Sequence, residues 1–492
     1  QYGLSEVRFF YVPVYARGPN PASGAKDVSI GTIDKPIDVT LDWRAGREAA
    51  THNVYFSSDE QAVIDGTVAA TTVTETSYGP LSLDLGKTYY WRVDEVNEAE
   101  TPATWQGKLW NFTTQEYFVV DDIESYNDLN PEDPNSNRIF LAWVDGYEQP
   151  MNGSIVGYDD VPFTEQTVVH GGEQSMPLFY DNSGTANYSE ATLTLSSGRN
   201  WTVKGVEALS LWFKGNPAGF VEEPAGTYTM TAAGADIWGT ADEFRYAWKQ
   251  LSGDGEITAT VESVLWVPGS DDWTKAGVMI RGTLDAGSPN AFVALTTGSG
   301  DGATFQWRSS AGGSSTSSRT LTGISPPSAI RLVRQGNTFT GYVFQNGQWQ
   351  QQGQSATVPM TDPVYIGLAL TSHSSGVTTE AVFSDVQTTG AVTGVFTEQA
   401  IGVDMPANTP DSMYVAVASS GGTPAVVRHD DPRAAQASDW TEWTIDLKRF
   451  SDGGVNLTNV DTISIGVGDK ANPQPGGAGL VFVDDIRLYP LP

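Results

Sequence analysis

The feature that most constrains the fold is a two-residue hydrophobic alternation, which recurs in short runs along most of the chain. Clear examples are the stretches 257–267 (ITATVESVLWV), 339–345 (FTGYVFQ) and 462–468 (TISIGVG). Successive side chains of a strand point to opposite faces, so this period is typical of half-buried β-strands. The 3.6-residue period of amphipathic helices is nearly absent. The sequence therefore predicts an all-β protein, and its 492 residues exceed what one core usually holds.

Charge and cysteine content exclude several classes of function. The net charge of −32 repels phosphate backbones and anionic headgroups, so we expect no nucleic-acid partner and no membrane insertion. No segment approaches the ~20 consecutive apolar residues that a membrane-spanning helix needs. The absence of cysteine excludes disulfides, thiolate zinc sites and cysteine nucleophiles. The abundant carboxylates suit calcium, which takes oxygen ligands.

The segment from Pro21 to Thr114 has short strands at regular spacing, which fits a β-sandwich. Within it, LSLDLGKTYYWRV (81–93) predicts a tyrosine corner in which Tyr89 or Tyr90 bonds back to the main chain. The segment resembles a fibronectin type III module, with Trp43 in the B-strand position and TYYWRV as the F strand. Such modules usually act as spacers.

An apolar strand followed by Asp-Asp-Ile occurs twice, as FVVDDIESY from residue 118 and as GLVFVDDIRLYP at 479–490. If these two strands are the first and last of one sandwich and pair, their carboxylates come together. The two ends resemble a jelly-roll carbohydrate-binding module. That resemblance implies a structural calcium ion held where these strands meet.

The jelly-roll pattern is interrupted after LSLWFKGNP (209–217) and resumes at MYVAVAS (413–419). Phrases between them, such as WTKAGVMIRG (273–282), resemble bacterial concanavalin A-like, LamG-type domains of secreted proteins. We therefore expect tandem β-sandwiches, one of them a jelly roll with a second sandwich inserted in a loop. The predicted boundaries are an N-terminal strand at 1–17, a fibronectin III-like domain at 18–116, a jelly roll at 117–221 and 392–492, and an insert at 222–391.

The calcium prediction rests on four carboxylates. Alternation places Asp122 and Glu124 on one face of the first strand, and Asp484 or Asp485 would approach from the last. Asp121 is out of phase, and we expect it to point to solvent. The alternative is that all of these are solvated carboxylates at strand ends. A second acidic stretch, DLNPED (128–133), lacks the glycine of an EF-hand loop, so it favours a turn.

Aromatic rings near polar loops are the natural candidates for glycan binding, since a flat ring covers the apolar face of a sugar. The candidates are Trp238, Trp273, Trp307 and Trp349. The competing interpretation for each is core packing, which is the commoner position of tryptophan in sandwiches.

No catalytic constellation is evident. The four histidines (His52, His170, His373, His429) are scattered singly, and GGEQSMP lacks the G-x-S-x-G elbow. The strand motif E-x-D-x-x-E of laminarinase-like sandwiches is also missing. We therefore expect a protein that is not an enzyme, with His170 serving as a turn residue.

The opening stretch YGLSEVRFFYVPVYAR reads as a strand without a home module and resembles the closing strand of a discoidin-type module. Its apolar residues are Val7, Phe9, Tyr11 and Val14. Either it extends a sheet of its own chain, or it completes an open edge of another copy and builds filaments. The chain starts at Gln1, which suggests a processed or truncated N-terminus.

Two hypotheses of function follow. The first is a secreted, bacterial, extracellular or cell-surface protein with a structural or adhesive role, which self-assembles through its first strand. The second is a set of glycan-binding accessory modules from a polysaccharide-degrading or surface-attached protein. Possible partners are copies of the chain itself and a polysaccharide.

Overall fold

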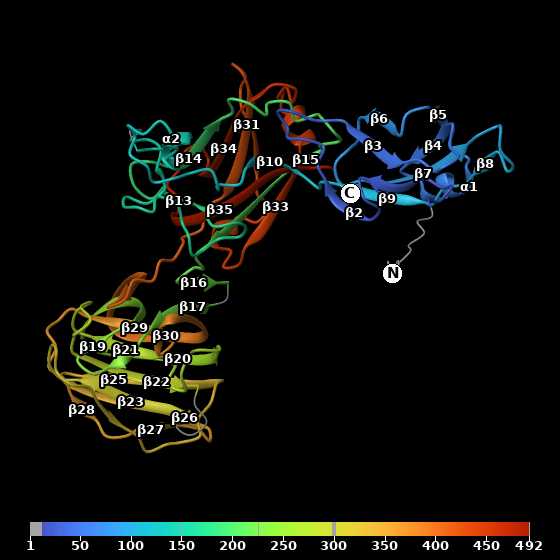
Figure 1. Cartoon of the computed structure of the whole chain (residues 1–492). Helices are drawn as coiled ribbons and strands as arrows, with labels where there is room; N and C mark the ends of the chain where they lie inside the picture. Colours follow the sequence, from blue (N-terminus) through green and yellow to red (C-terminus); the bar gives the residue numbers. More distant parts are fainter. Residues whose placement is uncertain (1–11, 148, 225, 298–301, 492) are drawn as a thin grey trace, which may run out of the picture. The chain divides into compact units, whose positions relative to one another are not determined.

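The computed structural model describes residues 12–147, 149–224, 226–297 and 302–491. Strands dominate these residues (Figure 1), which confirms the all-β fold class. The chain forms two compact units: unit 1 comprises Gln1–Gly215 and Asp411–Pro492, and unit 2 comprises Asn216–Pro410. The domain boundaries given above lie near these limits but divide the chain more finely, and they stay a prediction.

The first part of unit 1 is a sandwich of two sheets with a buried tryptophan core. Trp43 is 4% exposed and Trp91 is fully buried, and their rings meet edge to face at 6.2 Å. The Asp84 N–H donates to Tyr89 Oη at 3.1 Å, so the tyrosine corner is confirmed and belongs to Tyr89. One sheet contains β1 (Arg17–Asn20), β3 (Val39–Arg44) and β6 (Ser77–Leu81). The other contains β2 (Ala25–Val28), β9 (Trp110–Thr114), β7 (Thr88–Val96), β4 (Thr51–Ser57), β5 (Thr71–Val73) and β8 (Thr104–Trp105), beside helix α1 (Glu60–Asp65).

The rest of unit 1 is a second sandwich, built from strands on both sides of the interruption. Its first strand, β10 (Phe118–Asp121), pairs antiparallel with its last, β35 (Ala478–Tyr489), so the predicted pairing is confirmed. Four further strands complete that sheet: β12 (Ser154–Val156), β13 (Met176–Asp181), β15 (Ala208–Gly215) and β33 (Thr441–Asp446). The facing sheet has β11 (Trp143–Val144), β14 (Tyr188–Thr194), β34 (Val460–Gly468), β31 (Met413–Ser419) and β32 (Ala425–Arg428). Short helices α2 (Ile139–Ala142), η1 (Ala434–Gln436) and α3 (Lys448–Asp452) lie in the connections.

Unit 2 is organised by two long strands, β20 (Phe244–Val264) and β30 (Ser374–Ile401), which pair with each other. The first half of β20 pairs with β29 (Val364–Thr371) and the second half with β25 (Ser328–Gln335), so one strand serves two sets of neighbours. The core of unit 2 contains aliphatic and aromatic side chains, and Phe305, Phe339 and Phe383 are fully buried in it. The remaining strands are β16 (Phe220–Glu223), β17 (Thr227–Gly234), β18 (Ile237–Trp238), β19 (Ala241–Asp242), β21 (Lys275–Arg281), β22 (Asn290–Thr296), β23 (Ala303–Arg308), β24 (Thr316–Ser318), β26 (Thr338–Gln345), β27 (Gln348–Gln351) and β28 (Ala356–Thr357).

The prediction of an opening strand can be compared with the structure only from residue 12 onward. Val7, Phe9 and Tyr11 lie outside the described residues, and Val14 sits in a bend. The strand predicted at 1–17 is therefore wrong over residues 12–16, because β1 begins at Arg17. Here the Arg47 N–H donates to the Pro13 carbonyl at 3.1 Å, which holds the segment against residues 45–47. Self-assembly through residues 1–11 stays a prediction.

Within the described parts of the chain, no helix is both long and apolar enough to cross a membrane.

Candidate functional site

A loop of unit 1, residues 166–174, is closed at its base by a two-bond bridge between Glu165 and Ser175. The Glu165 carboxylate accepts from Thr167 and Val168 N–H groups, and from the Tyr158 hydroxyl at 2.5 Å. Burial would raise the pKa of Glu165, but the hydrogen bonds from Thr167 and Tyr158 outweigh it and lower that pKa to about 2. The base of the loop is thus fixed by an ionised carboxylate.

Carboxylates from the two Asp-Asp-Ile segments hold the rest of this loop. Asp484 Oδ2 accepts from the N–H groups of His170 and Gly171 at 2.9 and 3.1 Å. Glu124 Oε1 accepts from the N–H groups of Glu173 and Gln174 at 2.8 and 2.9 Å. We call residues 166–174 the anchored loop. Its backbone donors, which a surface loop would otherwise give to water, are fixed from both sides.

Two glycines let the carboxylates approach the anchored loop. A Cβ on Gly171 would lie 2.6 Å from Asp485 Oδ2, and one on Gly172 would lie 2.2 Å from Glu124 Oε1. Gly172 also has a φ of +64°, which favours glycine. The close contact therefore requires the Gly171-Gly172 pair, and this signal could have led sequence analysis to the loop.

Asp484 is fully buried at the centre of this arrangement. Burial raises the pKa of Asp484 to about 6, although the N–H donors of Gly171 and His170 oppose the shift. Its neighbour Asp485 has a positive φ of 48° and sits beside a register shift in β35, so adjacent carboxylates point to different partners. Asp485 Oδ2 lies 2.7 Å from His170 Nδ1, and Oδ1 accepts from Arg487.

The sequence predictions for the first Asp-Asp-Ile segment need correction. Strand β10 ends at Asp121 and Ile123 has a φ of +64°, so Asp122 and Glu124 lie beyond the strand and not on one of its faces. Asp121 was expected in solvent but is buried. It accepts from the Tyr126 hydroxyl at 2.6 Å and from Trp143 Nε1 at 2.9 Å. The alternation of side chains between the two faces of a strand applies only within the strand. Here the chain turns after Asp121, so an odd or even position no longer predicts which way a side chain points.

In this arrangement oxygens of these carboxylates already have partners. Calcium takes six to eight oxygen ligands, whereas Asp484, Asp485 and Glu124 direct oxygens to N–H groups, His170 and Arg487. Asp122 Oδ1 accepts from the Glu124 N–H at 3.3 Å. Among the described residues no group of three or more His, Asp or Glu side chains is placed to hold a metal ion. The predicted structural calcium therefore stays a prediction without support from this geometry.

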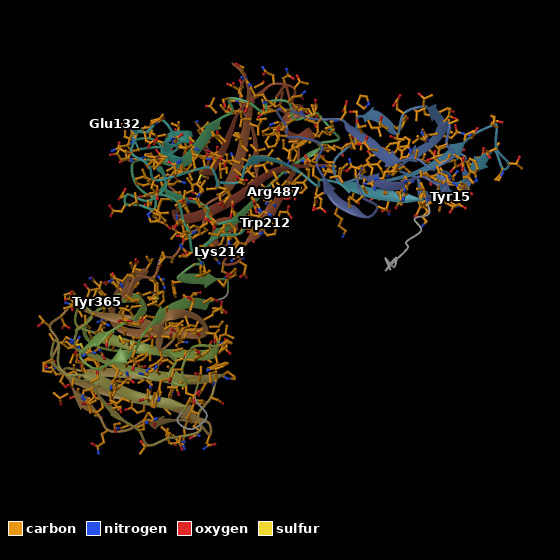
Figure 2. All side chains as sticks on the ribbon, in the orientation of Figure 1. Tyr15, Glu132, Trp212, Lys214, Tyr365 and Arg487 are labelled. Atoms are coloured by element: carbon orange, nitrogen blue, oxygen red, sulfur yellow. The ribbon has the colours of Figure 1, made fainter. Side chains whose placement is uncertain are left out.

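His170 takes part in an aromatic cluster that sequence analysis missed. Its imidazole stacks on the Trp212 ring at 3.8 Å with an interplanar angle of 14°, and meets Trp440 at 5.7 Å. Trp212 lies on β15 and Arg487 on the neighbouring β35 (Figure 2). The expectation that His170 is only a turn residue is therefore incomplete: the ring locks the anchored loop onto the sheet.

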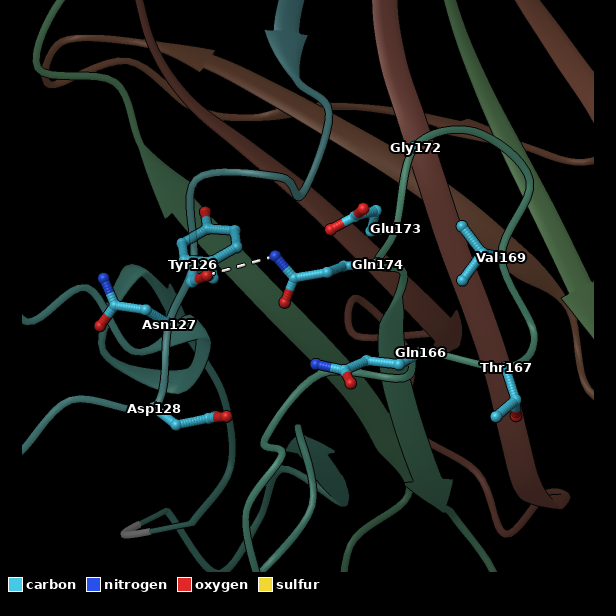
Figure 3. Close-up of a pocket in the computed structure, with 9 residues that line it drawn as sticks. All are labelled: Tyr126, Asn127, Asp128, Gln166, Thr167, Val169, Gly172, Glu173 and Gln174. Atoms are coloured by element: carbon cyan, nitrogen blue, oxygen red, sulfur yellow. Dashed lines mark hydrogen bonds between the residues drawn. The ribbon is translucent and has the colours of Figure 1, made fainter.

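The anchored loop forms one wall of a polar hollow of about 640 Å³ (Figure 3). Residues 126–128 form the opposite wall, and Asp128 and Gln166 point toward each other across the space. Gln174 donates to the Tyr126 carbonyl at 3.2 Å, which ties the walls together. Within the described chain, the side chains of Gln166 and Glu173 have no hydrogen-bond partner, so their polar groups face the hollow or solvent unpaired.

The DLNPED stretch is a turn, as predicted. Asn130 Oδ1 accepts from the Glu132 N–H at 3.2 Å, and Asp133 Oδ1 accepts from the Asn135 N–H at 2.8 Å. Asp128 Oδ1 accepts from the Phe163 N–H at 2.9 Å. These are side-chain-to-backbone bonds of the kind that stabilise turns.

The four predicted glycan-binding tryptophans all lie in unit 2, in separate settings. Trp307 packs against the core. Trp349 lies under the Arg331 guanidinium at 4.7 Å. Trp238 is 38% exposed, and it and Trp273 both lie near the ammonium of Lys275, at 5.8 and 5.7 Å. The structure therefore groups only Trp238 and Trp273.

No family model matches this chain, and no curated protein does. Among solved structures, weak similarity extends to a functionally unknown protein from Saccharomyces cerevisiae, with 15% identity and a TM-score of 0.25 over 36% of this chain and 95% of that one. The GH43B protein of a Bacteroides ovatus xyloglucan locus scores 0.27 at 10% identity, over 75% and 88% of the two chains. A xylan β-1,4-xylosidase from Bacillus halodurans scores 0.23 at 12% identity, over 71% of each. Similarities this low carry no argument about function.

Proposed function

We propose that this protein is a non-catalytic, extracellular carbohydrate-binding protein, and that the hollow beside the anchored loop binds a neutral glycan. The observation that carries the proposal is a polar hollow whose wall, the anchored loop, is held by hydrogen bonds to Asp484 and Glu124, while the side chains of Gln166 and Glu173 have no hydrogen-bond partner among the described residues. Of the two hypotheses drawn from the sequence, the hollow supports glycan binding.

The chemistry of the hollow matches sugar hydroxyls. The Gln166 amide both donates and accepts, and the Glu173 carboxylate accepts, which suits groups that do both. The hollow of about 640 Å³ falls in the usual range for small-ligand sites. The anchored loop does not have to order on binding, which removes one cost of association. Carboxylates at Asp128 and Glu173 repel uronates and sulfated sugars, so we propose a neutral glycan.

Binding of this kind gives the structural or adhesive hypothesis a mechanism, because it attaches the protein to a polysaccharide surface. Fibre formation through the first strand is a separate matter. It is tested by deleting residues 1–16 and measuring sedimentation, and unchanged sedimentation would contradict self-assembly.

The test of glycan binding is affinity electrophoresis in gels that contain a neutral or a uronate-rich polysaccharide. We expect retardation by a neutral polymer, weakened roughly tenfold by Gln166→Ala or Glu173→Ala, because each change removes about one hydrogen bond. Gln348→Ala, a change at an exposed residue of β27 in unit 2, is the matched control and should leave retardation unchanged.

Two outcomes would contradict the proposal. The first is no retardation by any member of a broad polysaccharide panel. The second is retardation that depends on Trp238 or Trp273 and not on Gln166 or Glu173, which would move the site to unit 2, where sequence analysis first placed it.

A further inference from the structure

In unit 2, a buried lysine at the start of a strand contacts an aspartate in a loop. Lys275 is the first residue of β21, and its side chain is 3% exposed. Its Nζ lies 2.5 Å from Oδ1 of Asp236, in the loop that joins β17 to β18. Lys275 is held in register by β22 and β29, opposite Thr296 and Thr371, so its stem is fixed.

The surroundings favour a reactive amine. The rings of Trp238 and Trp273 lie 5.8 and 5.7 Å from Lys275 Nζ and help exclude water. Burial lowers the pKa of Lys275, although the carboxylates of Asp236, Asp242 and Asp271 oppose the shift. A desolvated lysine is a stronger nucleophile, because a larger fraction of its side chains carries the neutral amine at a given pH.

The two oxygens of Asp236 have different partners, each suited to one step of an acyl transfer. The Ile237 N–H donates to Oδ1 at 2.6 Å, where it would stabilise negative charge that develops on that oxygen. His373 Nε2 lies 3.2 Å from Oδ2, within reach for proton transfer. His373 Nδ1 lies 3.6 Å from Asp271 Oδ1, and Asp271 is itself fixed by the Trp273 N–H at 2.8 Å.

His373 also has an unusual backbone. Its φ of +59° is rare for a residue with a side chain. Such outliers cluster at functional sites, where the surrounding structure keeps them. Here the Thr371 hydroxyl accepts from the His373 N–H at 3.4 Å.

We propose that Lys275 and Asp236 condense to an intramolecular amide, an isopeptide crosslink within unit 2. The Lys275 Nζ–Asp236 Cγ bond forms and the Cγ–Oδ2 bond breaks. The lysine nitrogen changes from an ammonium to an amide N–H and loses two protons. Nζ gives them to the Asp236 carboxyl group, which it contacts at Oδ1, and His373 delivers protons to the departing Oδ2. Oδ2 leaves as water, so atoms and charge balance without an oxidant or reductant. Holding the reacting atoms in contact supplies the effective concentration that the condensation needs.

Two other lysine–carboxylate pairs of the chain lack these features and serve as internal comparators. Lys204 lies 2.9 Å from Asp38, whose side chain is 44% exposed. Lys470 lies 2.5 Å from Glu190, but the lysine side chain is 54% exposed. Neither carboxylate has a histidine contact among the described residues, so we expect both to remain ion pairs.

The crosslink would tie the loop at Asp236 to the sheet at Lys275. A covalent closure of that segment restricts the unfolded chain and resists pulling, as disulfides do in other exported proteins. Because this chain has no cysteine, the amide would supply the covalent bond that disulfides cannot.

The decisive measurement is the intact mass of the unfolded full chain, followed by tandem mass spectrometry of proteolytic peptides. We expect a mass one water molecule below the sequence value and a branched peptide that joins residues 236 and 275. Full mass, with Asp236 and Lys275 found only in linear peptides, overturns the proposal. A water deficit that maps to a succinimide, without the branched peptide, overturns it as well.

Variants sharpen the result. Lys275→Met should restore the full mass, whereas the control Lys204→Met should keep the deficit. If Lys275→Met fails to fold, the wild-type mass still decides. His373→Gln should leave most of the freshly purified chain unlinked, and crosslinking as complete as in the wild type would contradict the proton relay. Tris-free buffers and an acid quench exclude crosslinking during handling.

Discussion

Buried carboxylates at one site of each unit are compensated in opposite ways. In unit 2, Asp242 is fully buried between two fully buried arginines: Arg308 binds it through both guanidinium nitrogens, at 2.5 and 2.8 Å, and Arg281 lies 3.5 Å away. In unit 1, Asp121 and Asp484 are buried against neutral donors only, namely a tyrosine hydroxyl, an indole N–H and backbone N–H groups.

The charge of the partners determines how each carboxyl site responds to pH. In both units burial raises the pKa of the carboxyl, but in unit 2 the guanidinium groups oppose that shift with full charges. At Asp121 and Asp484 only neutral donors oppose the shift, and the pKa of Asp484 stays raised at about 6, so this carboxyl group is sensitive to protonation. The Asp242 site of unit 2 is therefore locked by charge, whereas the anchored loop of unit 1 is held in part by Asp484, a group that pH can reach.

The largest expected effect comes from breaking the charge lock. Arg308→Ala should destabilise unit 2 by about 3–5 kcal/mol, because it leaves the buried Asp242 carboxylate with one charged partner, Arg281 at 3.5 Å, and the Asn290 amide at 3.2 Å. Urea unfolding measured by tryptophan fluorescence reports the loss. The control Lys448→Ala removes an exposed ion pair with Asp452 and should change stability by less than about 1 kcal/mol. Equal effects of the two changes would contradict the comparison.

Removal of Asp121 should have the next largest effect. Asp121→Ala leaves the Tyr126 hydroxyl and the Trp143 indole N–H buried without an acceptor, so we expect a loss of about 2–4 kcal/mol in unit 1. Thermal unfolding of the variant is compared with that of Asp159→Ala, at an exposed residue of the same unit. A loss no greater than that of the control would show that Asp121 is solvated, as first expected.

The pH dependence of Asp484 should be smaller. Its pKa is about 6 in the folded chain and 3.8 ordinarily, so the folded state binds the proton more tightly. The stability from this group is present below about pH 4 and is lost as pH rises through about 6. Between about pH 4 and pH 6 the Tm of the wild type should therefore fall relative to the Tm of Asp484→Asn, which has no group that titrates at this position. A constant difference across that window would contradict the raised pKa.

Calcium should have the smallest effect. N–H groups, His170 and Arg487 occupy carboxylate oxygens at the proposed ion site, so we expect no measurable change in Tm of unit 1 between calcium and a chelator. A rise of several degrees with calcium, absent in Asp484→Asn, would instead support the calcium site predicted from the sequence.

Local sequence was sufficient wherever one chain segment decides its own structure. The alternation in 462–468 predicted β34, and the Leu-Asp-Leu-Gly phrase predicted a tyrosine corner at Tyr89 or Tyr90, which the structure assigns to Tyr89. The repeated Asp-Asp-Ile segment even predicted a long-range pairing, because β10 and β35 carry matching patterns. The failures begin where the backbone leaves the regular pattern, at Ile123 and Asp485, whose positive φ values reorient the carboxylates.

The sequence alone therefore determined that this chain is all-β, cysteine-free and acidic, since composition and period-two alternation need no knowledge of distant neighbours. Only the tertiary structure decided what the acidic residues do. His170 meets Trp212 and Asp485, and Asp236 meets Lys275 and His373, across long separations in the chain. The physical reason is that the donors and charges around a carboxylate set its chemistry, and folding alone brings those groups to it.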